Sequence, residues 1–463
     1  MAALSAVRSA AEPRLSVQAA SGLRSARHPV KATEVMLTFL QLSDIHFRNR
    51  AKDDNDGEPG SAPDPDSEAQ DYLQRELLIE DARQQGQSVG GYSAVLVAGD
   101  IASVGEAEQF AQADTWLRNL CTAIEVKPWL VWTVPGNHDV ADGKIGDIGH
   151  ELRKRLREAA DGARDALFAQ ILAHAEEGPA LLAPLQSYLE FADAFDCAFD
   201  VSRLHWSADL AASGARQLQL RGVSSALLCA PGDAKPKKRP TILGEAQASD
   251  WADDRIHLSL CHHPHCWLLD VEEIDQLFGR HVQVRVTGHL HRRDLSHTDV
   301  GIYLQAGAVS PQRSREGGYG EGYEPTYDVI TVDQVEVGRK SYLEVAVRCR
   351  RWDDADGKWV AHGEEMRRFA IGHDAPSEPL QRAPEGDVEV LDVPMREARY
   401  KLAQMPQTDK LEYLEALGGP MGDFIDAPQW SIVTAIFDWA RDNGKLEELQ
   451  DLVINGHPPK AGD

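Results

Sequence analysis

The sequence has few cysteines, and their spacing does not join them into a framework. Six cysteines are spread over 463 residues, and none stands in a C-x-x-C pair. Disulfide scaffolds of secreted proteins and thiolate zinc sites both need denser or more regular spacing. We therefore expect reduced, buried thiols and a cytoplasmic protein.

Long apolar runs and an excess of positive charge are also missing. The sequence has no run of about 18 apolar residues, so it predicts no membrane span and no membrane partner. It carries 74 acidic and 48 basic residues, which gives a net charge of −26. That balance disfavours broad binding to the phosphate backbone of nucleic acid. Metal ions can still reverse the local field where a phosphate ester binds, so we expect nucleic acid only as a substrate.

The length predicts two or three domains, since 463 residues exceed one ordinary core. Residues 1–35 are rich in Ala, Ser and Arg. We interpret them as a disordered tail or as a start codon placed too early, because Met36 stands directly before the first strand. Residues 36–371 are expected to form the main domain, 372–390 a linker, and 391–463 a small helical domain.

The main domain begins with alternating strand and helix patterns. Apolar runs at 37–42, 94–98 and 129–134 are separated by helical patterns over 71–84 and 106–123. A run that is apolar throughout is typical of a strand covered on both faces. This alternation predicts an α/β layered fold. The helical pattern over 148–204 is interpreted as an insertion over or beside the functional site.

Residues that can bind metal ions follow five strand-like runs, and they are Asp44 and His46, Asp100, Asn137 to Asp139, His262 and His263, and His289 and His291. The carboxyl ends of strands are where open α/β sheets bind ligands. Imidazole together with carboxylate suits Mn, Fe, Zn, Co or Ni. Two ions about 3.5–4 Å apart can grip a phosphate and activate a water. The i, i+2 spacing of each Asp-x-His or His-x-His pair would put both side chains on one face of a regular strand.

The order of these blocks resembles that of the calcineurin-like metallophosphoesterases. Asp-x-His, Gly-Asp, Gly-Asn-His-Asp, His and Gly-His-x-His follow one another between residues 36 and 345. The resemblance implies a four-layer α/β sandwich of two packed β-sheets flanked by helices. To this fold the sequence adds the helical insertion and a small all-α C-terminal domain.

The resemblance also implies a role for each site residue. Asp44, His46 and His291 would hold one metal ion. Asn137, His262 and His289 would hold the other, and Asp100 would bridge the two. His138 would be catalytic without being a ligand, either donating a proton to the leaving oxygen or stabilising charge there. The cofactors expected are two divalent or mixed-valence transition metal ions, with Mn, Fe or Zn favoured.

The substrate expected from the resemblance is a phosphodiester. Protein phosphatases of the family carry Gly-Asn-His-Glu and a longer Gly-Asp-x-x-Asp-Arg-Gly block, whereas this chain has Asp139 and the segment Gly99-Asp100-Ile101-Ala102-Ser103. It is closer to the branch that acts on cyclic nucleotides and other small diesters by metal-activated hydroxide. The alternatives are a nuclease or nucleotide-cleaving effector, and a protein or small-molecule phosphomonoesterase.

Several neighbouring residues have two interpretations. His263 stands beside His262 and could take its place as a ligand or line the pocket. Asp139 is interpreted as a residue that orients a histidine, and His265 as a structural or rim residue. Arg292 and Arg293 are interpreted as surface residues, with contact to substrate phosphate as the alternative.

The C-terminal helices resemble the death-fold-like adaptors called effector-associated domains. The resemblance rests on residues 437–441, on Asn443-Gly444 and on residues 446–449. It implies a protein partner that binds through the tail and recruits the enzyme. A helical extension packed on the catalytic domain and a homodimer are the alternatives.

Overall fold

The computed structural model describes residues 36–48, 65–210, 216–229, 240–311, 323–338, 340–371, 393–420 and 429–456. The predicted tail over 1–35 and the predicted linker over 372–390 lie outside the described residues.

Within the described residues, one six-stranded sheet has the order β12-β11-β10-β1-β2-β3. Its strands are β1 (Leu37–Leu42), β2 (Ala94–Val97), β3 (Val131–Thr133), β10 (Thr326–Val337), β11 (Lys340–Asp353) and β12 (Lys358–Ile371). The three short strands run parallel, and the three long strands form an antiparallel meander that joins them along β1. Every residue of β1, β2 and β3 is buried, which explains their continuously apolar sequences.

A second six-stranded sheet in the described part of the chain has the order β4-β5-β6-β7-β9-β8. Its strands are β4 (His205–Leu210), β5 (Leu218–Val223), β6 (Ile256–Leu260), β7 (Val284–Thr287), β8 (Asp294–His297) and β9 (Ile302–Gln305). The four inner strands are parallel, and β4 and β8 close the edges in antiparallel pairs. One apolar core runs through both sheets.

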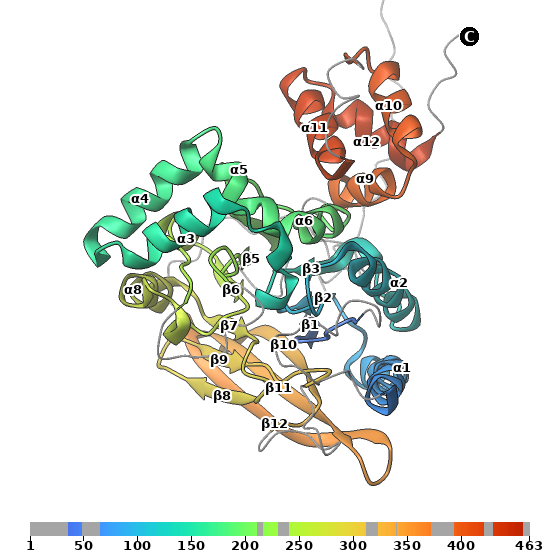
Figure 1. The fold of residues 1–463 in the computed structure, drawn as a ribbon. Coiled ribbons are helices and arrows are strands. Elements are labelled where there is room, and N and C mark those ends of the chain that lie inside the picture. Colours follow the sequence, from blue (N-terminus) through green and yellow to red (C-terminus); the bar gives the residue numbers. More distant parts are fainter. Residues whose placement is uncertain are drawn as a thin grey trace, which may run out of the picture.

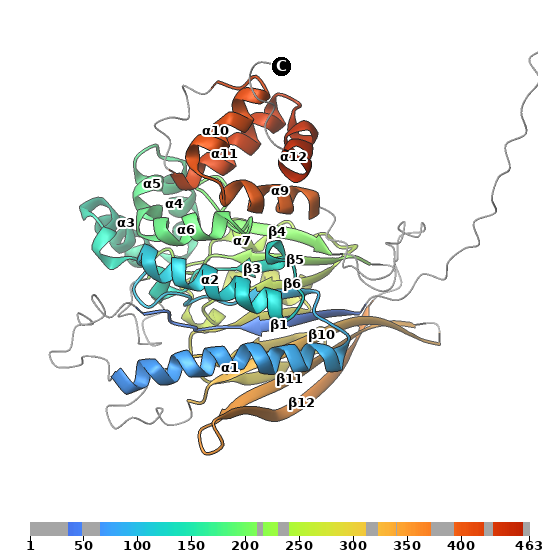
Figure 2. The same ribbon diagram turned by 90° about the vertical axis from the view of Figure 1, so that its right-hand side faces the viewer.

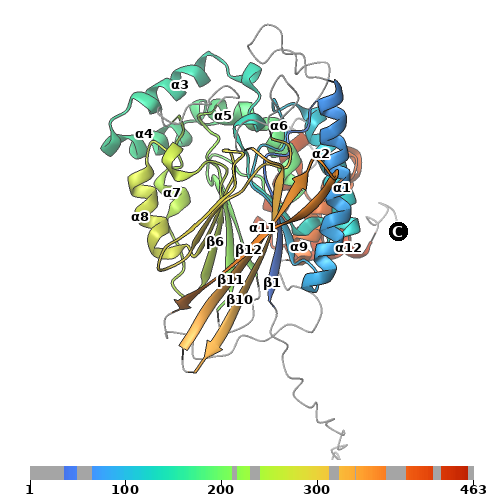
Figure 3. The ribbon, with the colours of Figure 1, turned by 90° about the horizontal axis from the view of Figure 1, so that it is seen from below.

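Helices flank the two sheets (Figures 1 and 3). They are α1 (Pro65–Val89), α2 (Ala107–Ala123), α3 (Asp147–Glu158), α4 (Asp161–Ala173), α5 (Glu177–Leu182), α6 (Gln186–Asp193), α7 (Glu245–Ala248) and α8 (Val271–His281). Two packed sheets between helices confirm the predicted fold class. Helices α3 to α6 occupy the region interpreted as a helical insertion. None of the helices that the structure describes is long and apolar enough to cross a membrane.

The structure differs from the sequence prediction mainly at the ends and edges of elements. Strand β3 is shorter than the predicted run over 129–134, because Pro128 begins a 3₁₀ turn that ends at Leu130. Strands β4 and β8 lie at sheet edges and were not predicted. Their residues are largely exposed or half-buried, so they lack the apolar pattern that marks an inner strand.

The C-terminal helices are α9 (Val393–Ala403), α10 (Gln407–Ala416), α11 (Gln429–Asp442) and α12 (Leu446–Asn455), and they form a group beside α6 and α2 (Figure 2). They have a buried apolar cluster of their own. Two buried arginines of α9 reach from this group into the main body. The Arg396 guanidinium donates to the carbonyls of Trp129, at 2.8 Å, and of Val131, at 3.2 Å. Arg399 pairs with Asp193 at 2.9 Å.

Candidate metal centre

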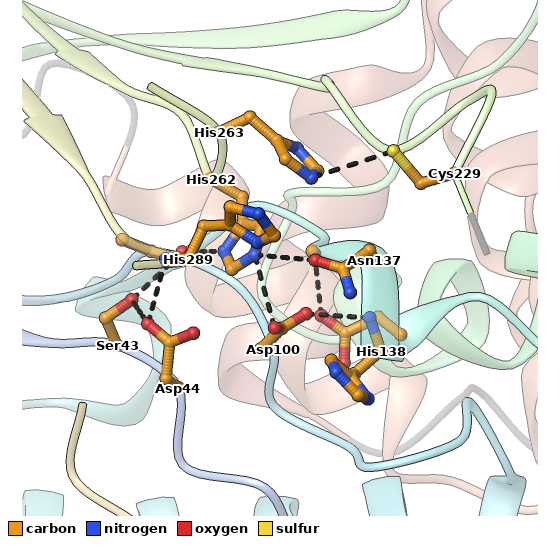
Figure 4. A network of polar contacts seen from close by, with 12 residues as sticks. Ser43, Asp44, Asp100, Asn137, His138, Cys229, His262, His263 and His289 are labelled. Carbon is orange, nitrogen blue, oxygen red and sulfur yellow. Dashed lines mark hydrogen bonds and ion pairs between the residues drawn. The ribbon is translucent and has the colours of Figure 1, made fainter. Parts of the chain in front are cut away.

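The eight predicted site residues meet where strands of both sheets end. Figure 4 shows Asp44, Asp100, Asn137, His138, His262 and His289 among them. Asp44 and His46 follow β1, Asp100 follows β2, and Asn137 and His138 lie in a 3₁₀ turn after β3; His262 follows β6, and His289 and His291 follow β7. Hydrogen bonds and ion pairs join these residues into two groups of four, one of Asp44, His46, His289 and His291 and the other of Asp100, Asn137, His138 and His262. The His46 backbone N–H donates to the Asp100 carbonyl oxygen at 3.1 Å and links the two groups into one network. The structure therefore brings the predicted residues of five separate segments together.

One side of the network contains Asp44, His46 and His291. Asp44 Oδ1 lies 3.2 Å from His291 Nε2 and 4.0 Å from His46 Nε2. The two histidine Nε2 atoms are 3.2 Å apart. With Asp100, these residues offer four ligand atoms within 4.8 Å of one another, an arrangement that could hold a metal ion.

The other side is organised around His262. Its Nε2 lies 3.2 Å from Asp100 Oδ2 and 3.2 Å from Asn137 Oδ1. Its Nδ1 lies 2.8 Å from the Ala98 carbonyl oxygen. That carbonyl can only accept, so Nδ1 carries the hydrogen and Nε2 is the nitrogen left to bind a metal ion.

His263 faces different partners from His262. Its Nδ1 lies 2.8 Å from Ser225 Oγ, and its Nε2 lies 3.6 Å from Cys229 Sγ. His263 also belongs with His262 and His289 to a second group whose side chains could hold a metal ion. We keep His262 as the predicted ligand. Its Nε2 atom faces both Asp100 and Asn137, whereas His263 faces neither of them in the contacts above.

The backbone at the site is held in an unusual conformation. Positive φ angles occur at Asp44 (52°), His46 (51°), Asp100 (49°), His289 (74°) and His291 (53°). These five make up most of the eight non-glycine residues with positive φ in the described ranges. The i, i+2 pairs do not lie on regular strands, since β1 ends at Leu42 and β7 at Thr287, so the one-face geometry of a strand does not apply to them. Left-handed turns aim these side chains instead, and such conformations cluster at functional sites.

The buried charges at the site are mutually stabilised. Burial alone would raise the pKa values of Asp44 and Asp100, but the adjacent histidines, His291 and His262 in turn, lower both. Burial opposes protonation of His262, yet the Asp100 carboxylate raises its pKa to about 9. Burial and the neighbouring His262 lower the pKa of His289 to about 3. Both carboxylates are therefore ionised and His289 is neutral, the forms that bind metal ions, whereas His262 has to lose its Nε2 proton when an ion binds.

A sequence model of the calcineurin-like phosphoesterases matches residues 37–293, which is more than half of the chain. The chain belongs to the calcineurin-like phosphoesterase family. Membership supports metal-dependent hydrolysis of a phosphoric ester at a centre of two metal ions. A search of curated proteins finds no match.

Solved structures with a similar fold include three that share little sequence with this phosphoesterase. Vacuolar protein sorting 29 from Cryptosporidium parvum has 14% identity over 73% of this chain and 99% of its own, with a TM-score of 0.29. The zinc complex of Vps29 from Entamoeba histolytica has 12% identity over 72% and 99%, with a TM-score of 0.26. A predicted phosphoesterase from Streptococcus pneumoniae has 12% identity over 73% and 100%, with a TM-score of 0.25.

The residues present fit the dimetal centre of the family. Asp44 Oδ1 is buried and accepts no hydrogen bond from any residue that the structure describes. It faces imidazole nitrogens of His46 and His291 instead. A buried carboxylate oxygen without a hydrogen-bond donor is costly, and a cation between these three side chains would satisfy it. The mixture of imidazole, carboxylate and amide ligands suits transition metals.

Two members of the Gly-Asn-His-Asp block hold the site together without facing a cation. The His138 backbone N–H donates to Asp100 Oδ1 at 2.8 Å, and His138 Nδ1 lies 2.8 Å from the Ser103 carbonyl oxygen. Asp139 accepts from the backbone N–H groups of Ala102 at 2.7 Å and Gly136 at 2.8 Å. The interpretation of Asp139 as a residue that orients a histidine is therefore wrong. Burial and the Asp100 charge raise its pKa to about 7.

Neighbouring residues settle some of the remaining interpretations. Arg293 donates to the buried Asp328 at 2.8 Å, and its side chain is only 17% exposed, so it is not the surface residue that the sequence suggested, whereas Arg292 is exposed. His265 pairs with Asp275 at 2.6 Å, which agrees with a structural role. Two residues that the sequence analysis did not single out also contact the site residues. Ser43 Oγ donates to Asp44 Oδ2 at 2.5 Å, and the centres of the Trp267 and His289 rings are 4.1 Å apart. The position of Ser43 directly before Asp44 was the available signal.

A substitution at Gly136 tests how closely the loop that carries Asn137 packs against Asp100. A Cβ atom there would overlap Asp100 Oδ1 and lie 2.5 Å from the Asp100 backbone nitrogen. We expect Gly136→Ala to lower the free energy of unfolding by about 1–3 kcal/mol through overpacking and to lower metal content. The measurements are denaturant unfolding and elemental analysis of the purified protein. Gly143→Ala is the matched control, because its Cβ would meet nothing within 4 Å. Equal metal content in the two variants would contradict the expected packing of the site.

Proposed function

We propose that this phosphoesterase is a dimetal phosphodiesterase that hydrolyses a small diester such as a cyclic nucleotide. The observation that carries the proposal is the convergence of two groups of ligand atoms on Asp100. Its Oδ2 faces His262, which stands with Asn137. The same carboxylate belongs to the group formed by Asp44, His46 and His291. One carboxylate thus has access to both proposed metal positions.

The residues divide between the two positions as the family resemblance implied. Asp44, His46 and His291 would hold one ion, Asn137, His262 and His289 the other, and Asp100 would bridge them. Two bound ions polarise the phosphoryl oxygens and lower the pKa of the attacking water. The protein residues fix the geometry: the Ala98 carbonyl orients His262, Ser43 orients Asp44, and Asp139 ties the loops that carry Asp100 and Asn137.

His138 is the proposed donor of a proton to the leaving oxygen. The Ser103 carbonyl engages Nδ1 at 2.8 Å, so Nε2 is the ring nitrogen that can face substrate. The side chain is only partly buried, whereas Asn137 and Asp139 on either side are buried. A histidine with one nitrogen fixed and the other accessible has the arrangement needed for general acid catalysis.

The charge around the centre supports a diester over a monoester. Within the described residues, no hydrogen bond or ion pair joins a lysine or arginine to the buried ligands Asp44, His46, Asp100, Asn137 and His262. Arg292, directly after His291, is exposed, and Arg293 is occupied by Asp328. A phosphate diester carries one negative charge and a monoester carries close to two. Buried ligands without a paired lysine or arginine to match the second charge suit the diester.

The effector hypothesis requires a C-terminal group free to bind a partner. The described α9 instead inserts Arg396 against carbonyls before and within β3. That contact supports the alternative in which the helices pack on the catalytic domain. Monoester hydrolysis remains the competing activity, and the substrate assay below separates the two.

Substrate preference tests the proposed activity directly. Metal-stripped protein is given Mn²⁺ and assayed on bis-p-nitrophenyl phosphate and on p-nitrophenyl phosphate. We expect kcat/KM for the diester to exceed that for the monoester by about tenfold or more, a difference of about 1.4 kcal/mol in transition-state binding. A preference for the monoester would contradict the diesterase proposal and would favour a phosphatase.

Replacement of His138 separates proton donation from metal binding. We expect His138→Ala to lower kcat on the diester by about 10²–10⁴-fold, the usual contribution of a general acid, with two metal ions still bound by elemental analysis. Asp100→Ala is the matched comparison, and there both metal content and activity should be lost. Loss of metal in His138→Ala, or activity that survives in Asp100→Ala, would show that the roles are assigned wrongly.

A further inference from the structure

Strand β12 (Lys358–Ile371) is the outer edge of the first sheet. It pairs with β11 on one side, and no strand in the described part of the chain pairs with its other side. Figure 1 shows this edge at the bottom of the molecule, at the opposite end from the C-terminal helices. An edge strand presents unpaired backbone N–H and C=O groups, which can form a ladder with another strand.

A bulge divides β12 into two parts. The register with β11 shifts between Arg348 and Arg350, opposite the stretch that contains Gly363, and Gly363 has a φ of 116°. From Glu364 to Ile371 the register with β11 is unbroken. Bulges twist an edge away from pairing partners, so the regular part after Gly363 is the segment that can accept a new strand.

In this regular part, two acidic residues precede one exposed apolar residue and two basic residues follow it. It reads Glu364-Glu365-Met366-Arg367-Arg368, and Met366 is 56% exposed. In an antiparallel pair of two copies centred on Met366, Glu364 would face Arg368 of the second copy, and Glu365 would face Arg367. Opposite charges that face each other across two strands are stabilising, and like charges are destabilising.

We propose that this edge binds the same edge of a second copy of the chain, antiparallel and centred on Met366. The two-fold arrangement satisfies all four ion pairs at once and buries the two Met366 side chains against each other at the axis. A parallel arrangement in the same register places Glu against Glu and Arg against Arg. Edge strands that are protected from association usually carry lysine or inward-pointing charges. This edge strand instead has charges that are complementary to those of a second, antiparallel copy.

Existing contacts leave these side chains accessible to a second copy. Glu364 Oε1 accepts from Arg348 at 2.9 Å, and Arg368 donates from Nε to Glu344 at 3.1 Å. These bonds hold the groups along the sheet faces, yet the Glu364 side chain remains 54% exposed and the Arg368 side chain 47% exposed. The net charge of −26 opposes indiscriminate association of copies. Local complementarity therefore selects this edge.

Charge exchange tests the pairing. The full-length protein and two double variants, Glu364→Arg/Glu365→Arg and Arg367→Glu/Arg368→Glu, are compared by analytical ultracentrifugation over a range of concentrations. We expect the wild type to dimerise, and each variant to weaken dimerisation by at least tenfold because its two copies repel. A 1:1 mixture of the variants should restore the dimer, since every facing pair is then complementary.

Controls separate this interface from unfolding and from other surfaces. β12 holds none of the site residues, so both variants should keep the diesterase activity of the wild type. Each variant loses an ion pair with Arg348 or Glu344 on β11, so the unfolding temperature should fall, but the variants should stay folded at the temperature of the experiment. Reversal of an exposed ion pair on α11, Asp438→Arg/Arg441→Asp, should leave the dimer unchanged. A wild type that is monomeric at every concentration would overturn the proposal. So would a dimer that persists in either β12 variant, or a mixture of folded variants that stays monomeric. A monomer in which the β12 amides that point away from β11 are protected from hydrogen exchange would also overturn it, because another segment of the same chain would then cover the edge.

Discussion

The buried carboxylate of Asp100 is the group on which both halves of the site depend. Its Oδ1 accepts from the His138 backbone N–H, and its Oδ2 faces His262. The first contact joins the loops after β2 and β3 of one sheet, and the second reaches the loop after β6 of the other. Burying an anion costs on the order of several kcal/mol unless it is paired. The left-handed backbone at Asp100 adds to that cost. The proposed metal ions would compensate the cost of burying this anion.

Most of the site could be predicted because metal chemistry restricts the residue types and their place at strand ends. The five blocks each follow an apolar run, and the structure joins all of them. The aim of the side chains could not be predicted. The spacing of Asp44 and His46 suggested a strand face, but left-handed turns beyond β1 orient them. His262 and His263 could not be separated in sequence because they are adjacent. Only the contacts with Asp100 and with Ser225 distinguish them. The edge strands β4 and β8 were missed since half-exposed residues carry little apolar signal.

The C-terminal helices illustrate a second limit of sequence analysis. Their apolar faces predicted a helical group, and the structure shows a separate apolar cluster there. Nothing in the pattern of α9 indicated that Arg396 and Arg399 would be buried against the main body. Arg396 stacks over the Trp132 ring, 4.7 Å from its centre, and binds carbonyls near the start of β3. That strand ends at Thr133, and three residues separate it from the turn that begins at Asn137. The helices thus contact the start of β3, and the proposed catalytic residues follow the end of the same strand.

The most direct test of this account is the position of the metal ions. A crystal of the protein grown with Mn²⁺ should be measured at the Mn absorption edge. We expect two anomalous peaks about 3.5–4 Å apart on either side of Asp100, one beside His46 and His291 and the other beside Asn137 and His262. A single peak, or a second peak between His263 and Cys229, would contradict the assignment of Asp100 as the bridging ligand of a two-metal centre.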